Sequence, residues 1–328
     1  MPVLVWWMVL AICMDEFESP TERLLNSESS FPMIDQRITL HDGRTLSYDD
    51  YGDPAGVPVI LFHGLGSSRR FHPPDEQTLI AQNIHLVVPD RPGIGGSSRT
   101  PAHNILGYAE DIATLDKVLQ LGRFIALGWS AGAAYALACA YALPTHISMV
   151  GIVSGAAPFT GADAPHHLPN QWRRIGLMTH YAPWMIRRFF RQTSHKITTD
   201  ADAALKKSIE EMDAPDRALM AQPAIYQMMR EATIEGFINH GEGVADDALA
   251  LARPWGFALN EIQQQVLLWY GSDDTTWPVQ VGQDLAKRLL HAELTVTDGA
   301  AHLLLLSHWQ SILERLLERA AAFSPSYA

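Results

Sequence analysis

Ser130 lies in a setting that could make a serine nucleophilic. It is the central residue of Gly128-Trp129-Ser130-Ala131-Gly132, which follows the apolar run 124–127 and precedes the small-residue run 133–143. A strand, a sharp turn that carries a serine, and then a helix is the setting in which G-x-S-x-G presents an exposed hydroxyl. The glycines let the strand and the helix approach each other closely. The sequence therefore predicts that Ser130 is a nucleophile.

A serine hydroxyl becomes reactive only beside a base, normally a histidine that a carboxylate orients. In open parallel sheets such groups gather beyond the carboxyl ends of the strands. The apolar run 266–270 leads into a loop that contains Asp274, and the run 293–297 leads into a loop that contains His302. The chain order Ser130, Asp274, His302 therefore predicts a catalytic triad.

The elements that must position these residues are visible as apolar runs. Several of them lack the alternation of a half-exposed strand and are separated by segments with helical spacing, which predicts a parallel sheet covered on both faces. A hairpin is expected before them, over residues 37–48, with its turn at 41–44. The buried strands are expected at 57–62, 84–88, 124–127, 147–153 and 266–270.

The alternation of strand and helix stops after Pro158 and resumes at Val266. The intervening helical segments are rich in Trp, Met, Tyr and charge, and one helix is expected over 201–212 with Thr199 and Asp200 as caps. We therefore expect an N-terminal apolar segment and lead-in over 1–32, a first core part over 33–157, a helical cap over 158–255 and a second core part over 256–328.

Composition excludes several classes of protein. The chain has 328 residues, of which 47% are hydrophobic and 18% charged, as in folded globular proteins. A net charge of −12 argues against a nucleic-acid partner. The two cysteines, Cys13 and Cys139, form no disulfide framework or zinc spacing, so we expect a reducing, cytoplasmic location and no metal site. The adjacent His166 and His167 are expected in a surface loop.

The N-terminal run from Val3 to Cys13 is continuously apolar but too short to span a bilayer. It lacks the basic residues and cleavage site of a signal peptide. Three interpretations remain: an arm that packs on the body or on a partner, an extension upstream of a start near Met14, or a weak membrane anchor. We expect no stable membrane insertion, and a homodimer remains open.

These segments resemble the α/β-hydrolase superfamily over about residues 35–155 and 256–322. The pieces that carry the resemblance are His63-Gly64-Leu65-Gly66, the segment 90–95, the serine pentapeptide 128–132, the Gly271…Asp274…Pro278 element, and Gly299-Ala300-Ala301-His302. The resemblance implies the α/β-hydrolase fold: a mostly parallel central sheet flanked by helices, with an inserted helical cap.

The resemblance also selects among candidate residues. In relatives with a G-x-x-D-x-x-x-P element the carboxylate is the aspartate three residues after the glycine, which favours Asp274 over Asp273. His302 is preferred to His291 and His308 because it falls in the loop between the last strand and the final helix, expected over 303–322.

An oxyanion hole is expected from two backbone N–H groups. One belongs to Ala131, directly after the nucleophile, and the resemblance assigns the other to Leu65. Gly64 allows the backbone to approach the substrate. Further candidates for the substrate pocket are Trp129, beside the nucleophile, and Trp184 and Met185 in the cap, each of which could instead only pack.

A serine nucleophile indicates acyl transfer through an acyl-enzyme, with water as the usual acceptor. The leading hypothesis is an esterase that cleaves small apolar carboxylic esters, with lactones and thioesters as further substrates and no cofactor. Alternatives are a proline-iminopeptidase-like or carbon–carbon-bond hydrolase, a ligand receptor, and, by analogy only, a perhydrolase or haloperoxidase. An aminopeptidase would need acidic cap residues near the site, for which Glu231, Glu235 and Glu242 are candidates.

Overall fold

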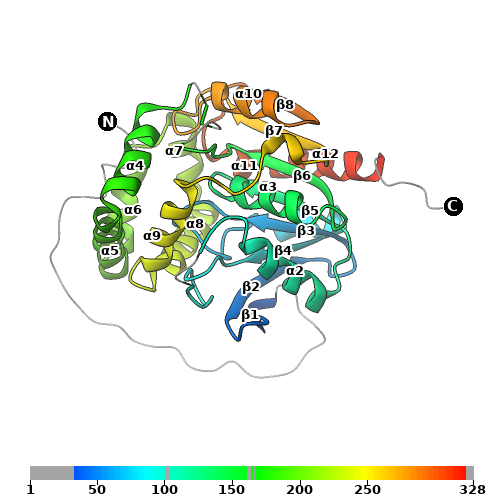
Figure 1. Ribbon diagram of the computed structural model, residues 1–328, viewed down its shortest axis with the longest axis horizontal. Helices are drawn as coiled ribbons and strands as arrows, with labels where there is room; N and C mark the ends of the chain where they lie inside the picture. The colour runs from blue at the N-terminus through cyan, green and yellow to red at the C-terminus, as the bar shows by residue number, and fades with distance from the viewer. Residues whose placement is uncertain (1–32, 101–102, 161–163, 166, 323–328) are drawn as a thin grey trace.

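The computed structural model describes residues 33–100, 103–160, 164–165 and 167–322. The predicted N-terminal segment 1–32 and His166 lie outside these residues. Within the described residues, eight strands form one sheet in the order β1-β2-β4-β3-β5-β6-β7-β8 (Figure 1). The strands are β1 (Met33–Thr39), β2 (Thr45–Gly52), β3 (Val57–Phe62), β4 (Ile84–Pro89), β5 (Phe124–Trp129), β6 (Ile147–Val153), β7 (Val266–Gly271) and β8 (Ala292–Thr297).

The sheet is mostly parallel, as predicted. Among the strands of the described residues, only β1 with β2 and β2 with β4 pair antiparallel, and β4, β3, β5, β6, β7 and β8 run parallel to one another. The first two strands form the predicted hairpin, with its turn at residues 40–44. The parallel strands place the loops that follow β5, β7 and β8 at one edge of the sheet.

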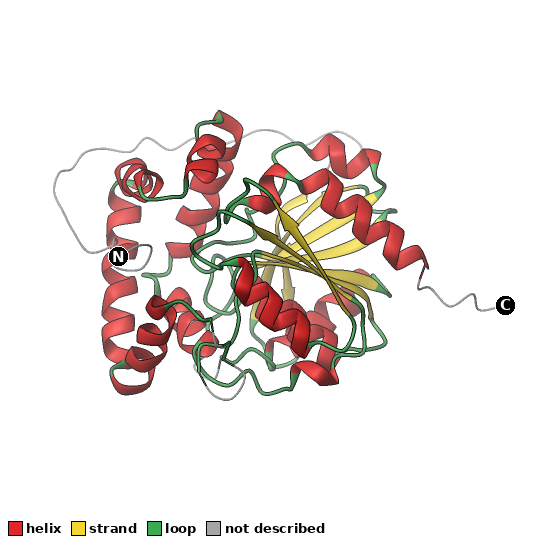
Figure 2. Cartoon of the chain, turned by 90° about the horizontal axis from the view of Figure 1, so that it is seen from above, coloured by secondary structure: helices red, strands yellow, loops and turns green. Residues whose placement is uncertain are grey.

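Alternate side chains of each central strand face opposite sides of the sheet, and helices cover both (Figure 2). In β3, Ile60 and Phe62 face one hydrophobic cluster, and Val59 and Leu61 face the other. The first cluster includes side chains from α2 (Tyr108–Leu119), α3 (Gly132–Ala142) and α10 (Val279–Arg288), and the second includes side chains from α1 (Glu76–Ala81), α11 (Leu304–Ser307) and α12 (Trp309–Ala322).

Within the described residues, six α-helices lie between β6 and β7 along the chain, in the segment proposed as the cap. Proline occupies the first turn of three of them, where its missing N–H needs no partner. Asp200 caps a fourth by accepting the N–H of Ala203 at 2.9 Å, as predicted, whereas Thr199, the other predicted cap, is the last residue of α5. The helices are α4 (Asn170–Tyr181), α5 (Pro183–Thr199), α6 (Ala201–Glu210), α7 (Ala214–Met220), α8 (Pro223–Phe237) and α9 (Glu242–Leu251), followed by the 3₁₀ turn η2 (Leu259–Glu261).

Carboxylates from these helices bind residues of the core, among them Asp216, Glu235 and Asp247. Asp216 of α7 binds the loop before α11, Asp247 of α9 binds Arg91, and Glu235 of α8 binds Arg69 at 2.5 Å. The Asp216 and Asp247 side chains are buried, so losing their partners would leave charge without compensation. We call these three contacts the cap anchors.

The final helix, expected as one element over 303–322, is interrupted at His308. The backbone of His308 has φ −124° and ψ 21°, outside the helical region, and the four leucines 303–306 before it are all buried. The short α11 ends at Ser307, and α12 restarts with the carbonyl of His308 accepting the N–H of Ile312 at 3.0 Å. No helix in the described part of the chain is long and apolar enough to cross a membrane.

Candidate active site

Ser130 lies on the sharp turn between β5 and α3. Its φ is +54°, a region that residues other than glycine rarely adopt. Hydrogen bonds hold this backbone: the N–H of Ser130 donates to the carbonyl of Val153 at 3.0 Å, and its own carbonyl accepts N–H groups from Ala133 and Ala156. The surrounding structure therefore fixes the direction in which the Ser130 side chain leaves the turn.

The two glycines of the pentapeptide are required by space. A Cβ added to Gly132 would lie 1.8 Å from the carbonyl oxygen of Phe62, and one added to Gly128 would lie 2.7 Å from Cα of Ala133. Both neighbours are backbone atoms, one at the end of β3 and the other in α3. No residue with a side chain fits at either position without moving β3 or α3.

The structure brings Ser130, His302 and Asp274 together, although they come from three separate loops. His302 Nε2 lies 3.1 Å from Ser130 Oγ, and His302 Nδ1 lies 3.1 Å from Asp274 Oδ2. The other carboxylate oxygen of Asp274 accepts the backbone N–H groups of Thr276 and Trp277 at 2.8 and 2.9 Å. This geometry orients the imidazole so that Nε2 can accept a proton from the serine hydroxyl.

A second carboxylate contacts the histidine from the cap. Asp216 Oδ2 accepts the backbone N–H of His302 at 3.0 Å, and Oδ1 accepts that of Leu303 at 2.9 Å. Burial raises the pKa of Asp216 to about 6. The sequence alone gave no signal for this contact, because an aspartate in the first turn of a helix is ordinarily explained by the helix dipole.

The environment of His302 favours its protonated form. Burial on its own would lower the pKa of the imidazole, but the negative charge of Asp274 and the hydrogen bond to it act in the opposite direction. The charges of Asp216 and Asp213 add to this effect, and together they raise the pKa of His302 above its ordinary value. The imidazolium that would form during proton transfer is therefore stabilised.

Trp129 packs beneath this arrangement. Its indole N–H donates to the carbonyl of His302 at 3.0 Å, and its ring stacks on Phe71 with centroids 4.3 Å apart. A Cβ on Gly64 would collide with this ring at 2.7 Å. The residue next to the serine thus supports the histidine loop, and its predicted contact with substrate stays a prediction.

The two predicted oxyanion donors belong to the loop after β3 and to the turn after β5. The structure gives the backbone N–H groups of Leu65 and Ala131 no acceptor among the described residues, so both are available to a ligand. Arg91 fixes the first loop, donating to the carbonyls of His63 at 2.6 Å and Gly64 at 3.0 Å. Because the carbonyl and N–H of one peptide point in opposite directions, holding the Gly64 carbonyl also fixes the Leu65 N–H.

Arg91 is itself buried and paired with a cap residue. Its guanidinium contacts Asp247 of α9 at 2.7 and 3.0 Å, and Asp247 also accepts the hydroxyl of Tyr135 from α3. The charge of Arg91 holds the pKa of Asp247 below its ordinary value, although burial opposes this. Arg91 therefore ties the loop after β3 to α9 in the interior of the molecule.

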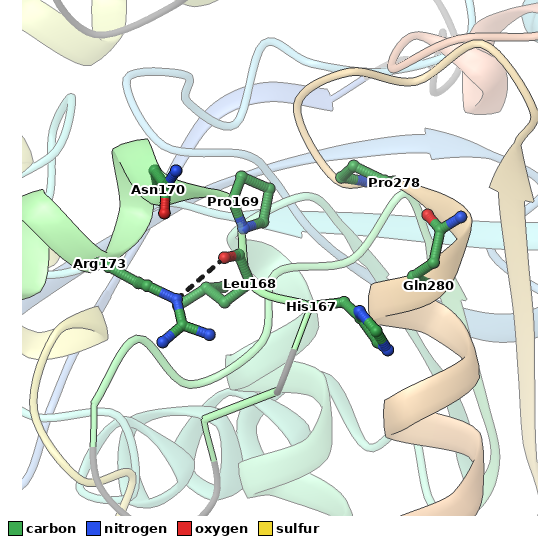
Figure 3. A pocket seen from close by; sticks show the side chains of 7 residues that line it. All are labelled: His167, Leu168, Pro169, Asn170, Arg173, Pro278 and Gln280. Atoms are coloured by element: carbon green, nitrogen blue, oxygen red, sulfur yellow. Dashed lines mark hydrogen bonds between the residues drawn. The ribbon is translucent and has the colours of Figure 1, made fainter.

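The remaining pocket candidates lie elsewhere. Trp184 and Met185 begin α5 and are largely exposed, so their contact with substrate also stays a prediction. A groove of about 630 Å³ lies between the starts of α4 and α10 (Figure 3), and its lining includes none of the triad residues. It is lined by His167, Leu168, Pro169, Asn170, Arg173, Pro278 and Gln280.

In the described part of the chain, no group of three or more His, Cys, Asp or Glu side chains is placed to hold a metal ion. Cys139 is buried in α3, and burial raises the pKa of its thiol. The nucleophile candidate that the geometry supports is therefore the serine.

Comparison with known proteins agrees with this geometry. Residues 57–308 match the family described by the alpha/beta hydrolase fold. The chain is 26% identical over 255 residues to the pimeloyl-acyl-carrier protein methyl ester esterase of Neisseria meningitidis, covering 76% of this chain and 87% of that protein. It is 28% identical over 301 residues to a proline iminopeptidase of Xylella fastidiosa, covering 81% and 89%.

Among solved structures, the esterase EaEST from Exiguobacterium antarcticum has a TM-score of 0.65 and 20% identity. The similarity covers 88% of this chain and 100% of that one. At this level of identity it shows a common fold.

Proposed function

This chain belongs to the alpha/beta hydrolase fold family, and we propose that it is a serine hydrolase that cleaves carboxylic esters. Lactones and thioesters are the further substrate classes. The observation that carries the proposal is the unbroken set of contacts from Asp274 through His302 to Ser130, at 3.1 Å each. The match to a methyl ester esterase supports the ester class.

In the proposed mechanism, Ser130 Oγ attacks the carbonyl carbon of the ester while His302 Nε2 takes the hydroxyl proton. Asp274 accepts the hydrogen bond from Nδ1–H and stabilises the imidazolium. The carbonyl π electrons move onto oxygen, and this oxyanion receives hydrogen bonds from the N–H groups of Leu65 and Ala131. When the C–O bond breaks, the alcohol leaves with the proton from His302, and the acyl group remains on Ser130.

Deacylation repeats these steps with water. His302 takes a proton from a water molecule, whose oxygen attacks the acyl carbon, and Ser130 leaves with that proton. The carboxylic acid product then departs, and the enzyme returns to its starting protonation state. Donors that are fixed before the reaction need no reorganisation, and each such donor contributes roughly 3 kcal/mol of transition-state stabilisation.

The acidic cap residues argue against aminopeptidase activity, despite the similarity to a proline iminopeptidase. Two of the candidates for holding a substrate amine are already paired: Glu235 with Arg69 at 2.5 Å, and Glu242 with Arg191 at 2.6 Å. The third, Glu231, accepts the side-chain amide of Gln227 in an exposed position. These contacts favour a neutral ester over an amino-terminal substrate.

Measuring turnover distinguishes an enzyme from a ligand receptor with the same fold. A panel of p-nitrophenyl esters of increasing acyl length, methyl esters, lactones and proline p-nitroanilide should show turnover on esters and little on the anilide. Tight binding with negligible turnover on every ester would indicate a receptor, and preference for the anilide would indicate an aminopeptidase.

The assignment of Ser130 is tested by labelling and by substitution. A fluorophosphonate should add to Ser130 in the wild type, and the adduct should be absent from Ser130→Ala, which should also lose ester hydrolysis while keeping its fold. Ser311→Ala, on the exposed face of α12, is the control and should behave as the wild type. Full activity in Ser130→Ala would refute the proposal.

A further inference from the structure

The connection between α4 and α5 exposes an unusual group of large apolar side chains. Tyr181 is 78% exposed, Trp184 64% and Leu177 59%, and Met178 and Met185 beside them are also exposed. We call these five residues, with Arg174 and Arg188, the α4–α5 corner. The two helices lie at the edge of the molecule opposite α12 (Figure 1). Clustered exposed apolar side chains of this size mark a contact surface.

The helices that form the α4–α5 corner are basic, whereas the protein as a whole is acidic. Residues 170–199 carry six Lys and Arg residues and no Asp or Glu, although the whole chain has a net charge of −12. Two of these arginines, Arg187 and Arg191, pair with carboxylates of α9. Arg174 and Arg188, one helical turn from the apolar residues, have no ion-pair partner among the described residues. The corner therefore presents free positive charge beside its apolar tip.

We propose that the α4–α5 corner docks the protein on an anionic lipid surface. Tryptophan and tyrosine combine an apolar ring with a polar atom and favour the boundary between headgroups and acyl chains. Arginines beside them would contact lipid phosphates, each contributing in proportion to the negative surface potential. Apolar residues that penetrate the boundary together with basic residues above it are the arrangement found in proteins that lie on a membrane without crossing it.

A second copy of the chain fits this surface less well. A two-fold contact would place the corner of one molecule against the same corner of the other. Since residues 170–199 contain no acidic side chain, the arginines of both copies would then face each other without compensation. A lipid surface supplies both the apolar layer and the negative charge.

Docking on lipid is tested by a binding experiment, so its outcome does not depend on the proposed hydrolysis. The full chain is mixed with vesicles of phosphatidylcholine containing about one-third phosphatidylglycerol, and with vesicles of phosphatidylcholine alone, and the bound fraction is measured by cosedimentation. We expect binding to the anionic vesicles that weakens with salt. Arg174→Glu/Arg188→Glu should weaken it by at least about tenfold, and Tyr181→Ser/Trp184→Ser by a similar factor.

The matched control is Val118→Ala/Arg123→Glu, which changes an exposed apolar residue and an exposed arginine on α2 and before β5. It should keep the wild-type affinity, and unchanged melting temperatures should show that all variants fold. Wild-type protein that ignores anionic vesicles, or corner variants that bind as well as the wild type, would overturn the proposal. The proposal would also be overturned if vesicles are not bound and the α4–α5 corner instead controls dimerisation or binds an acidic carrier protein.

Discussion

The carboxylate of Asp216 accepts the backbone N–H of His302 at 3.0 Å, which joins a cap helix directly to the histidine beside Ser130. The same carboxylate accepts the next N–H along the chain, from Leu303. The proposed base is therefore held by two carboxylates from different parts of the fold: Asp274 at its ring and Asp216 at its backbone.

Replacing Asp216 with asparagine should shift the pH profile of hydrolysis. The charge of Asp216 contributes to the raised pKa of His302, and the reaction needs the neutral imidazole. Asp216→Asn removes that charge, so the pKa of His302 falls and the acid limb of kcat/KM moves to lower pH. The effect depends on ionised Asp216 and thus on pH above about 6, the pKa to which burial raises this carboxyl.

Asp202→Asn is the control for this profile, because Asp202 is an exposed carboxylate of α6 that pairs with Arg230. It should leave the acid limb in place. An acid limb that moves to higher pH in Asp216→Asn, or that moves equally in both variants, would contradict the assigned influence of Asp216.

Asp274→Asn should lower kcat by about ten-thousand-fold with a small change in KM, because the amide favours the wrong imidazole tautomer. Asp273→Asn is a matched control one residue away, where the carboxylate accepts the hydroxyl of Ser272 at 2.9 Å. Steady-state kinetics on one ester should show near wild-type activity for Asp273→Asn. Low activity in Asp273→Asn with near wild-type activity in Asp274→Asn would instead assign the orienting carboxylate to Asp273.

Gly132→Ala should destabilise the protein by more than about 4 kcal/mol or prevent folding, because its Cβ would lie 1.8 Å from the carbonyl oxygen of Phe62. Gly122→Ala is a useful comparison, since its φ is +72° and nothing lies within 4 Å of the added Cβ. There only backbone strain acts, at a cost of about 1 kcal/mol. Urea unfolding of both variants measures the difference, and equal costs would contradict the steric argument.

Arg91→Lys should lower kcat by about tenfold to a hundredfold with KM nearly unchanged, because an ammonium cannot hold two carbonyls and a carboxylate in a fixed fork. The Leu65 N–H would then lose its fixed direction. Arg99→Lys is the control. Arg99 is partly exposed and pairs with Asp246, the neighbour of Asp247 on α9, and its replacement should leave kcat unchanged. Unaltered kcat in Arg91→Lys would show that the loop holds its geometry by other means.

The sheet and the relative positions of Ser130, Asp274 and His302 follow from local patterns. Continuous apolar runs mark buried parallel strands, and parallel strands bring the loops after their carboxyl ends to one edge. The start of a helix could be predicted where a capping side chain was present, as at Asp200. The interruption at His308 could not be predicted, because helical spacing continues through it.

The contacts between the cap and the core could not be predicted from the sequence. Asp216 and His302 are 86 positions apart, and Arg91 and Asp247 are 156 positions apart. The amphipathic pattern of a cap helix indicates which face is buried, but it does not specify the loop that this face meets. A buried aspartate and a surface aspartate therefore look alike until the helices are placed.

The cap anchors have a consequence for how a substrate molecule can enter. Swinging the cap away as a rigid lid would break the contacts of Asp216, Asp247 and Glu235 together, and would strand the Arg91 guanidinium without its counter-ion. The same movement would take the Asp216 carboxylate away from the backbone of His302 and the Asp247 carboxylate away from Arg91, which holds the loop that carries Leu65. A molecule with its cap swung away would therefore lack the geometry that hydrolysis needs. Substrate entry and bond cleavage would then occur at separate times in each turnover.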